Sequence, residues 1–232
     1  MAIEQKGSQT RRRLLEAAFE VICRKGFQAA GLNEILELAG LTKGAIYHHF
    51  RGKTALGYAV VEEIVGELIA QRWIAPLTTE GDPLTMIPKV MRTAAGDMAE
   101  SDIARGCPLG NLAAEMSALD DGFARRIDAI YQEWRDALAG ALSAGKSVIG
   151  DDPQRIATFI VATLAGCLAQ AKVVARRDVL LDGVSELEFY LHQLRTDAAE
   201  PRAAKPPADE PPEPEPLYAP PAPPAEMEDY LL

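Results

Sequence analysis

The hydrophobic and polar positions of this 232-residue chain follow a helical period over most of its length. Apolar side chains recur at the three- and four-residue spacing of one helix face, for example at Ile35, Leu36 and Ala39. Glycine and proline fall mainly between such segments, and no alternating strand pattern competes with them. The sequence therefore predicts an all-α fold.

Residues 31–50 are the most informative segment, because they predict two short helices joined by a tight turn. The first helix is expected to end at Ala39, since Gly40 can adopt the left-handed backbone conformation that terminates a helix. Thr42 is then a favourable N-cap, whose hydroxyl can accept a free backbone N–H of the second helix. Ile46 supplies the inner face of that second helix. In front of the pair, an apolar stripe predicts a longer helix that closes a three-helix domain.

The second helix is predicted over about Thr42 to His49, and its outer face has residues that suit contact with DNA. Small residues permit close approach to a groove, a lysine and a tyrosine can reach phosphates, and Thr42 or His48 can address base edges. We also expect Lys53, which opens the following helix, to meet a phosphate together with that helix's N-terminus. The predicted DNA-binding residues are Arg12, Gly31, Thr42, Lys43, Gly44, Ala45, Tyr47, His48, His49 and Lys53.

The segment from about Ser8 to Leu56 resembles the N-terminal domain of the TetR family of one-component transcriptional regulators. The matching positions share one register and are Arg12 or Arg13, Leu15, Ala17, Ala18, Lys25, Gly26, Phe27, Ile35, the run 39–44, the run 47–50 and Lys53. The chain departs from the family where Ala30 and Gly31 replace a usual threonine or serine, Thr54 an acidic residue and Leu36 an alanine. These departures bear on fine operator contacts and leave the motif intact.

The resemblance implies a homodimer that binds double-stranded operator DNA, and most members of the family are repressors. A formal net charge of −10 argues against DNA binding at first sight, because such proteins usually present a basic surface. The distribution removes the objection. Residues 1–55 hold nine lysines and arginines against five carboxylates, a net +4, so the other residues sum to −14. An acidic body behind a basic head orients the molecule on DNA.

After the head, the pattern predicts a larger helical domain with helices at about 54–73, 83–101, 108–116, 120–142, 153–175 and 181–194. The first of these would connect the head to the body. We divide the chain into a helix-turn-helix DNA-binding domain at 8–55, an effector-binding and dimerisation domain at 56–197, and a tail at 198–232. The tail is rich in proline and acidic residues, so we expect it to be disordered. It either solubilises the protein, docks through its apolar ends, or competes with phosphate for the basic head.

The helix predicted after Pro153 is too uniformly apolar, and too rich in small residues, for a solvent-exposed face along its whole length. With the last helix it could form half of a four-helix bundle across a two-fold axis, and the family resemblance implies the same interface. The alternative is that this helix is the buried centre of a monomer. The predicted dimer-interface residues are Ala162, Gly166, Ala169, Leu187 and Leu191.

The segment from Gly106 to Ser117 resembles one found in a subset of TetR regulators. Some of those respond to electrophiles or oxidants through a cysteine near this place, and others bind small carbon compounds. A cysteine beside a helix start can have a lowered pKa and a reactive thiolate, whereas a small buried core residue explains Cys107 equally simply. We expect an apolar or amphipathic small-molecule effector that changes the spacing of the two heads. The predicted pocket residues are Cys107, Asn111, Tyr131, Trp134 and Phe159.

Other classes of function find little support. Two of the three histidines belong to the predicted recognition helix, and no phosphate-cradling loop, paired-carboxylate motif or metal-ligand cluster is present, so we predict no enzyme, no cofactor and no metal. Three widely spaced cysteines fit neither a disulfide framework nor a zinc site. We find no 18-residue apolar run and no secretion signal, and we therefore predict a cytoplasmic protein. A helical protein-binding adaptor is a further alternative, which the basic head disfavours.

Overall fold

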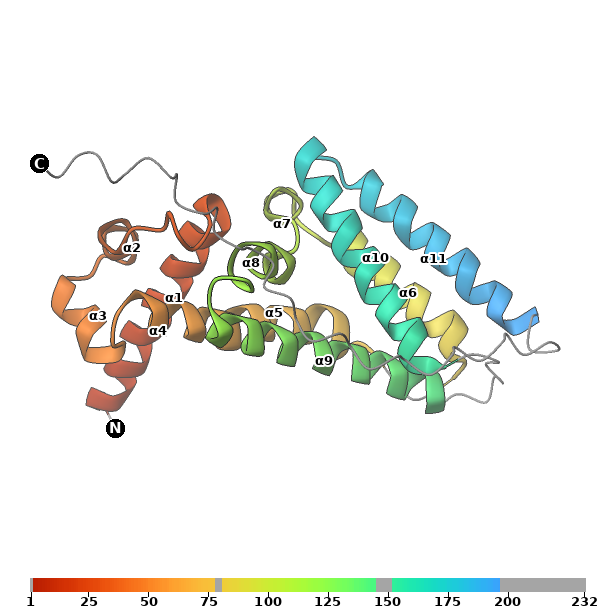
Figure 1. Cartoon of the computed structure of the whole chain (residues 1–232), viewed down its shortest axis with the longest axis horizontal. Helices are drawn as coiled ribbons and strands as arrows, with labels where there is room; N and C mark the ends of the chain where they lie inside the picture. Colours follow the sequence, from red (N-terminus) through yellow and green to blue (C-terminus); the bar gives the residue numbers. More distant parts are fainter. Residues whose placement is uncertain (1, 78–80, 145–151, 197–232) are drawn as a thin grey trace, which may run out of the picture. The chain divides into compact units, whose positions relative to one another are not determined.

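The computed structural model describes residues 2–77, 81–144 and 152–196, and the regular elements in these ranges are all helical (Figure 1). The all-α prediction is therefore confirmed. Two short π-helical segments carry the symbol η. In chain order the elements are α1 (Ala2–Lys25), α2 (Leu32–Ala39), α3 (Lys43–His49), α4 (Lys53–Ala59), η1 (Val60–Val65), α5 (Gly66–Ile69), η2 (Ala70–Ile74), α6 (Pro83–Gly96), α7 (Glu100–Arg105), α8 (Pro108–Met116), α9 (Asp121–Ala144), α10 (Pro153–Val174) and α11 (Asp178–Thr196). The tail predicted at 198–232 lies outside the described residues.

The head consists of α1, α2 and α3, with α1 packed against both short helices. The predicted turn between α2 and α3 is confirmed. Gly40 has φ 63° and ψ 42°, and the Leu41 N–H donates back to the Leu36 carbonyl oxygen at 3.0 Å, which closes the helix end. Thr42 occupies the N-cap position of α3 in extended backbone conformation, but its side chain makes no capping hydrogen bond, so that part of the expectation is wrong.

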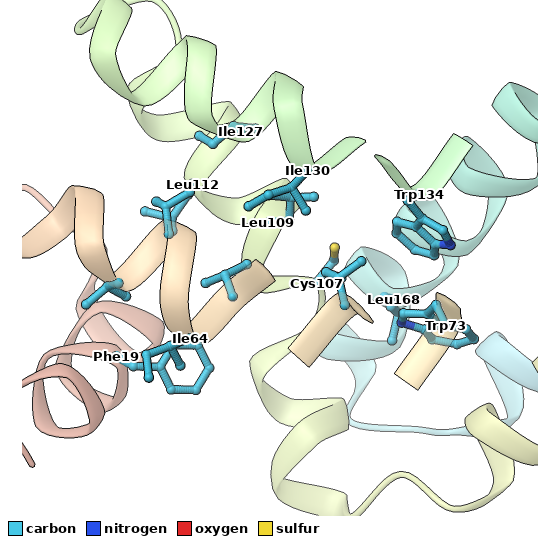
Figure 2. Close-up of a cluster of buried hydrophobic side chains, with 14 of the residues drawn as sticks. Phe19, Ile64, Trp73, Cys107, Leu109, Leu112, Ile127, Ile130, Trp134 and Leu168 are labelled. Carbon is cyan, nitrogen blue, oxygen red and sulfur yellow. The ribbon is translucent and has the colours of Figure 1, made fainter. Parts of the chain in front are cut away.

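The connector from head to body is a continuous helical run from α4 through η2, close to the predicted span 54–73. Two of its four segments, η1 and η2, are π-helical, a widened geometry that is often found at functional sites. Val60, Val65 and Trp73 are buried along the connector. Trp73 stacks on Trp134 of α9, with ring centroids 5.8 Å apart, and Figure 2 shows both indoles beside Leu168 of α10. The connector is thus anchored in the core of the body.

The body consists of α6 to α11, of which α6, α8 and α9 pack against the connector. Helix α10 packs against α9 and α11, and α11 packs against α6 (Figure 1). The helix predicted over 83–101 is instead divided, because α6 ends at Gly96 and α7 begins at Glu100. Met98 between them is buried, and its carbonyl oxygen accepts a hydrogen bond from Arg177 near the start of α11. A long-range contact therefore sets this boundary.

By length and composition α10 could cross a membrane, which corrects the expectation that the chain holds no such run. The same properties fit a core helix of a soluble protein, and 39% of the most apolar 18-residue window is buried. Ile156, Ile160, Leu164 and Leu168 lie in the core formed with the neighbouring helices. A second face of α10 stays exposed and is described below.

The turn after α1 is held by the body through one carboxylate. Glu115 of α8 accepts hydrogen bonds from the backbone N–H groups of Phe27 and Gln28, each at 2.8 Å. Gly26 makes this approach possible, since its φ is 82° and a Cβ there would lie 2.8 Å from a Glu115 oxygen. The head is therefore attached to α8 as well as to the connector.

An aromatic cluster beside this turn joins head, connector and body. The Phe27 ring packs on Phe123 of α9 with centroids 4.6 Å apart, and Tyr58 of α4 meets the same ring at 4.9 Å. Gly57 allows the contact, because a Cβ at this position would come within 2.7 Å of the Phe123 ring and closer still to the Phe27 ring. The Tyr58 hydroxyl donates to Asp120 at 2.7 Å, which fixes the cluster to the start of α9.

Candidate nucleic-acid interface

Helix α3 presents a polar outer face on a buried anchor. Ile46 is buried against the head, whereas Thr42, Lys43 and Gly44 are exposed and Tyr47 keeps 69% of its surface accessible. Within the described part of the chain, Lys43 makes no ion pair. Its ammonium group and the Tyr47 hydroxyl are thus available to phosphates or base edges.

The two histidines lie at the C-terminal end of α3. Their rings meet edge-on with centroids 4.7 Å apart, and His49 also contacts the buried Phe50. Partial burial lowers the pKa of His49, and the nearby His48 and Arg11 lower it further. This shift favours the neutral imidazole of His49. His48 is the more exposed of the pair and the better placed to reach a base.

Two predicted DNA-binding residues have protein partners. Lys53 donates to the Gln28 carbonyl oxygen at 2.8 Å and lies over the Phe27 ring at 4.9 Å. Arg12 forms ion pairs with Glu16 at 2.8 Å and with Glu67 of α5 at 2.9 Å. Both side chains thus help to hold the head on the connector. Arg51, which follows α3, is exposed and was not among the predicted residues, although its position after the recognition helix was a usable signal.

Arg12 is the middle residue of a basic triplet in α1, and the sequence analysis predicted a DNA contact for Arg12 alone. Arg11 makes a bidentate ion pair with Glu63 of η1, and Arg13 donates to the carbonyl oxygen of Ala39 at the end of α2. Three successive arginines therefore connect η1, α5 and the turn between the two short helices. Such partners are far apart in sequence, so the residue pattern alone did not identify them.

Gly31 is exposed at the N-cap of α2, and a Cβ added there would meet no atom within 4 Å. Ala45 is partly buried in α3. Neither residue supplies a side-chain hydrogen bond to DNA. Their contribution to the predicted surface is the small volume that lets backbone groups approach a phosphate.

The predicted effector residues do not share one pocket. Cys107, Tyr131 and Trp134 belong to the core at the start of α8 and on α9, and Figure 2 shows Cys107 and Trp134 in the same buried cluster. Asn111 of α8 instead lines a smaller groove next to α1, and its side-chain amide donates to the Arg105 carbonyl oxygen at 2.9 Å. Phe159 is 47% exposed on α10 and packs edge-on against Tyr190 of α11. The structure therefore separates Asn111 and Phe159 from the other three residues.

Cys107 has the environment of a core residue. It is only 2% exposed, and burial raises the pKa of its thiol despite hydrogen bonds from the start of α8, including one from the Gly110 N–H to Sγ at 3.4 Å. Burial also raises the pKa of Tyr131 nearby to about 12. A buried, protonated thiol reacts slowly with electrophiles and oxidants. The alternative of a cysteine-based sensor is therefore not favoured.

The predicted dimer residues also divide. Ala162, Gly166 and Ala169 lie exposed along one face of α10, in line with Phe159 and Val173. Leu187 and Leu191 of α11 are instead buried inside the chain, because α6 packs against this helix. The exposed apolar residue of α11 is Phe189, which the sequence analysis missed, since periodicity does not tell which apolar face a neighbouring helix covers.

Comparison with protein families divides the chain into two matched regions. Residues 14–60 match the bacterial regulatory proteins of the tetR family. Residues 83–186 match the C-terminal domain of LmrA/YxaF-like transcriptional regulators. Both regions agree with the helices that form the head and the body.

Individual relatives point the same way. The transcriptional regulator AcuR of Cereibacter sphaeroides is 31% identical over 173 residues, which cover 72% of this chain and 78% of that protein. The HTH-type transcriptional repressor NemR of Escherichia coli is 26% identical over 168 residues, covering 71% and 84%. Among solved structures, the regulatory protein TetR from Rhodobacter sphaeroides superposes with a TM-score of 0.69 at 28% identity, covering 77% of this chain and 97% of that one. The reduced form of E. coli NemR superposes with a TM-score of 0.67 at 27% identity, covering 77% and 95%.

Proposed function

This chain belongs to the TetR family of DNA-binding transcriptional regulators, and from that membership we propose that it is a homodimeric repressor that leaves a palindromic operator when a small effector binds its body. The observation that carries the proposal is the polar outer face of α3 on its buried anchor, Ile46. We assign DNA binding to residues 8–55 and effector binding with dimerisation to residues 56–197. A regulator of this kind works on the chromosome, so we place it in the cytoplasm.

The exposed face of α10 supports a dimer. Phe159, Ala162, Gly166, Ala169 and Val173 recur every three or four residues along it, and the small residues among them allow a second helix to approach closely. Two copies of α10 and α11 would form a four-helix bundle that covers this apolar stripe. Each dimer would then present two α3 helices to half-sites about one helical turn of DNA apart.

The direction of regulation rests on the relatives. NemR and the DhaR protein of a Mycobacterium species are both named as repressors, and we extend that role to this chain. A small effector can release DNA only if it binds the DNA-free arrangement of the heads more tightly than the DNA-bound one.

The test is fluorescence anisotropy of the full chain on labelled DNA from upstream of its own gene, compared with scrambled DNA over a salt series. Tyr47→Ala and Lys43→Gln should each weaken operator binding. Because a dimer uses each contact twice, Lys43→Gln should also lower the salt slope by about 2 if it removes two phosphate contacts. Arg135→Gln removes the same charge from α9 of the body and should leave both quantities unchanged.

Two outcomes would contradict the proposal. One is equal binding to operator and scrambled DNA, if a genome-wide binding selection also finds no preferred site. The other is specific binding that neither α3 substitution weakens, because the recognition surface would then lie elsewhere. Sedimentation of Gly166→Arg, which places a large charged side chain on the exposed α10 face, tests the dimer separately. A dimer that persists in this variant would rule out the α10 interface.

A further inference from the structure

A groove of about 770 Å³ lies on the described chain, and none of the predicted effector residues lines it. Its walls are the connector and α6, and Arg12 of the head also lines it. Leu68, Met86 and Val90 provide apolar surface within it. The volume is typical of small-molecule sites.

Both walls of the groove are irregular helices. Ile64 and Arg72 enter it from the two π-helical segments, η1 and η2, and π-helical turns are frequent at functional sites. The opposite wall, α6, holds Pro88 inside the helix, where proline removes a backbone hydrogen bond and favours a bend. Each wall therefore has a backbone irregularity that can absorb a small displacement.

Three cationic side chains, Arg12, Arg72 and Lys89, line the groove together with the carboxylates of Glu67 and Asp97. Both arginines already have carboxylate partners, because Arg72 pairs with Asp102 at 2.6 Å and Arg12 pairs with Glu16 and Glu67. Lys89 is exposed and makes no ion pair within the described residues. An incoming carboxylate can pair with Lys89, and near the head it can replace the half-exposed Glu67 at Arg12.

Arg12 connects the groove to the turn at Gly40 between α2 and α3. Its neighbours in α1 are fixed at both sides, because Arg11 pairs with Glu63 in η1 and Arg13 donates to the Ala39 carbonyl oxygen that precedes the Gly40 turn. A ligand that changes the partner of Arg12 therefore acts on α1 between these two anchors. The displacement has a short path to the segment that orients α3.

We propose that this groove binds the effector, and that the effector is a small amphipathic anion with a carboxylate that pairs with Lys89 or Arg12 and an apolar part against Leu68, Met86 and Val90. The inference rests on the proposed function for its regulatory meaning, although binding itself is measured without DNA. It differs from the pocket around Cys107 and Tyr131 that the sequence suggested.

Octanoate is the probe for the test, and octylammonium and octan-1-ol have the same chain length with a positive and a neutral head group. Isothermal titration calorimetry of the full chain should show one octanoate per chain with a Kd of about 1 mM or tighter. The two other probes should bind at least about tenfold more weakly. Binding should also change the tryptophan fluorescence, because both tryptophans of the chain lie in the Trp73–Trp134 stack next to Arg72.

Matched variants locate the site. Ala94→Phe fills the groove and should weaken octanoate binding at least about tenfold, and Lys89→Gln should weaken it about five- to tenfold through the lost charge-assisted contact. Ala129→Phe makes the same change on an exposed position of α9 outside the groove and should leave the affinity unchanged. Should Ala94→Phe fail to fold by circular dichroism, Thr93→Phe at the exposed rim replaces it.

Three results would overturn the proposal: no binding of octanoate, equal binding of octylammonium, or octanoate binding that survives the groove-filling variants. Loss of binding in Tyr131→Phe alone would place the site at the interior cluster instead. The failure of the proposed function is a separate result. If octanoate binds the groove but the chain has no specific operator, the effector site is supported and the repressor role is contradicted. If the chain binds its operator but not octanoate, the repressor role is supported and the effector site is contradicted.

Discussion

Glu115 is the most direct test of how the body holds the head. Its carboxylate accepts two backbone hydrogen bonds of 2.8 Å from Phe27 and Gln28, in the turn that follows α1. Truncation in Glu115→Ala removes both bonds at once. The Phe27 N–H is partly buried and is left without this acceptor, whereas the exposed Gln28 N–H can be rehydrated.

The expected cost follows from these environments. A hydrogen bond to a charged group contributes about 1.5–3 kcal/mol when it is not replaced by water. With one of the two N–H groups rehydrated, we expect Glu115→Ala to lower the free energy of unfolding by about 1–3 kcal/mol. For a chain of this size, 2 kcal/mol corresponds to a fall in Tm of about 4–8 °C. Glu115→Gln keeps one acceptor oxygen and should lose about half as much.

Urea unfolding at one fixed protein concentration measures the change, since the stability of the proposed dimer would depend on concentration. Glu133→Ala removes an exposed carboxylate from α9 and should stay within about 0.5 kcal/mol of the parent. We also expect Glu115→Ala to weaken operator binding, because the head is then held mainly through the connector. A Glu115→Ala protein as stable as Glu133→Ala, with unchanged operator affinity, would refute this account of the junction.

Three further predictions concern single features of the chain. Gly57→Ala should destabilise the folded chain by about 1–3 kcal/mol, because the added Cβ overlaps the Phe27 and Phe123 rings. Gly140→Ala, whose Cβ would meet no atom within 4 Å, should stabilise the fold by about 0.5–1 kcal/mol in thermal unfolding. A Gly57→Ala chain that is more stable than the parent would contradict the close packing of the two rings on Gly57. Hydrogen bonding to Arg11 holds the pKa of Glu63 below its usual 4.5, so the stabilising contribution of this ion pair is complete above about pH 4.5 and is lost as the pH falls through the lower folded value. The free energy of unfolding of Glu63→Gln, measured in urea, should therefore depend less on pH in that range than that of the parent. An unchanged pH dependence would exclude this pair as the cause. Burial raises the pKa of all three thiols, that of Cys23 to about 12. Iodoacetamide at pH 7.5 should therefore label Cys107 far more slowly in the native chain than in the urea-unfolded chain, and Cys107→Ser should keep its operator affinity. Rapid labelling that abolishes operator binding would support the sensor alternative.

The parts of the fold that the sequence predicted well are those with local causes. The end of α2 depends on Gly40, and the start of α10 depends on Asp152, whose side chain accepts the Gln154 N–H at 2.9 Å. Both causes lie within a few residues of the feature that they produce. The end of α6 was predicted wrongly, because it depends on the burial of Met98 and on Arg177, a residue 79 positions away.

The site shows the same division. The exposed face of α3 follows from its own periodicity, and the sequence correctly placed Tyr47, Lys43 and His48 on that face. The partners of Arg12 and Lys53 were not, since ion pairs and carbonyl contacts across the head depend on how α1 meets the connector. Leu187 was assigned to a dimer interface for a related reason: an apolar face shows that something covers a helix, and here the cover is α6 of the same chain.

Two of the attachments between the head and the rest of the chain start from different helices. The first attachment is Glu115, which lies on α8, a nine-residue helix whose first turn lies beside Cys107 and Tyr131. The arginine triplet of α1 leads instead to Glu63 and Glu67 at the edge of the groove. A ligand that favours one head position must alter at least one of these attachments, because an effector without different contacts in the two states cannot shift them. Glu115→Ala and Lys89→Gln therefore separate the two routes: the first should change operator affinity in the absence of ligand, and the second should change only its response to octanoate.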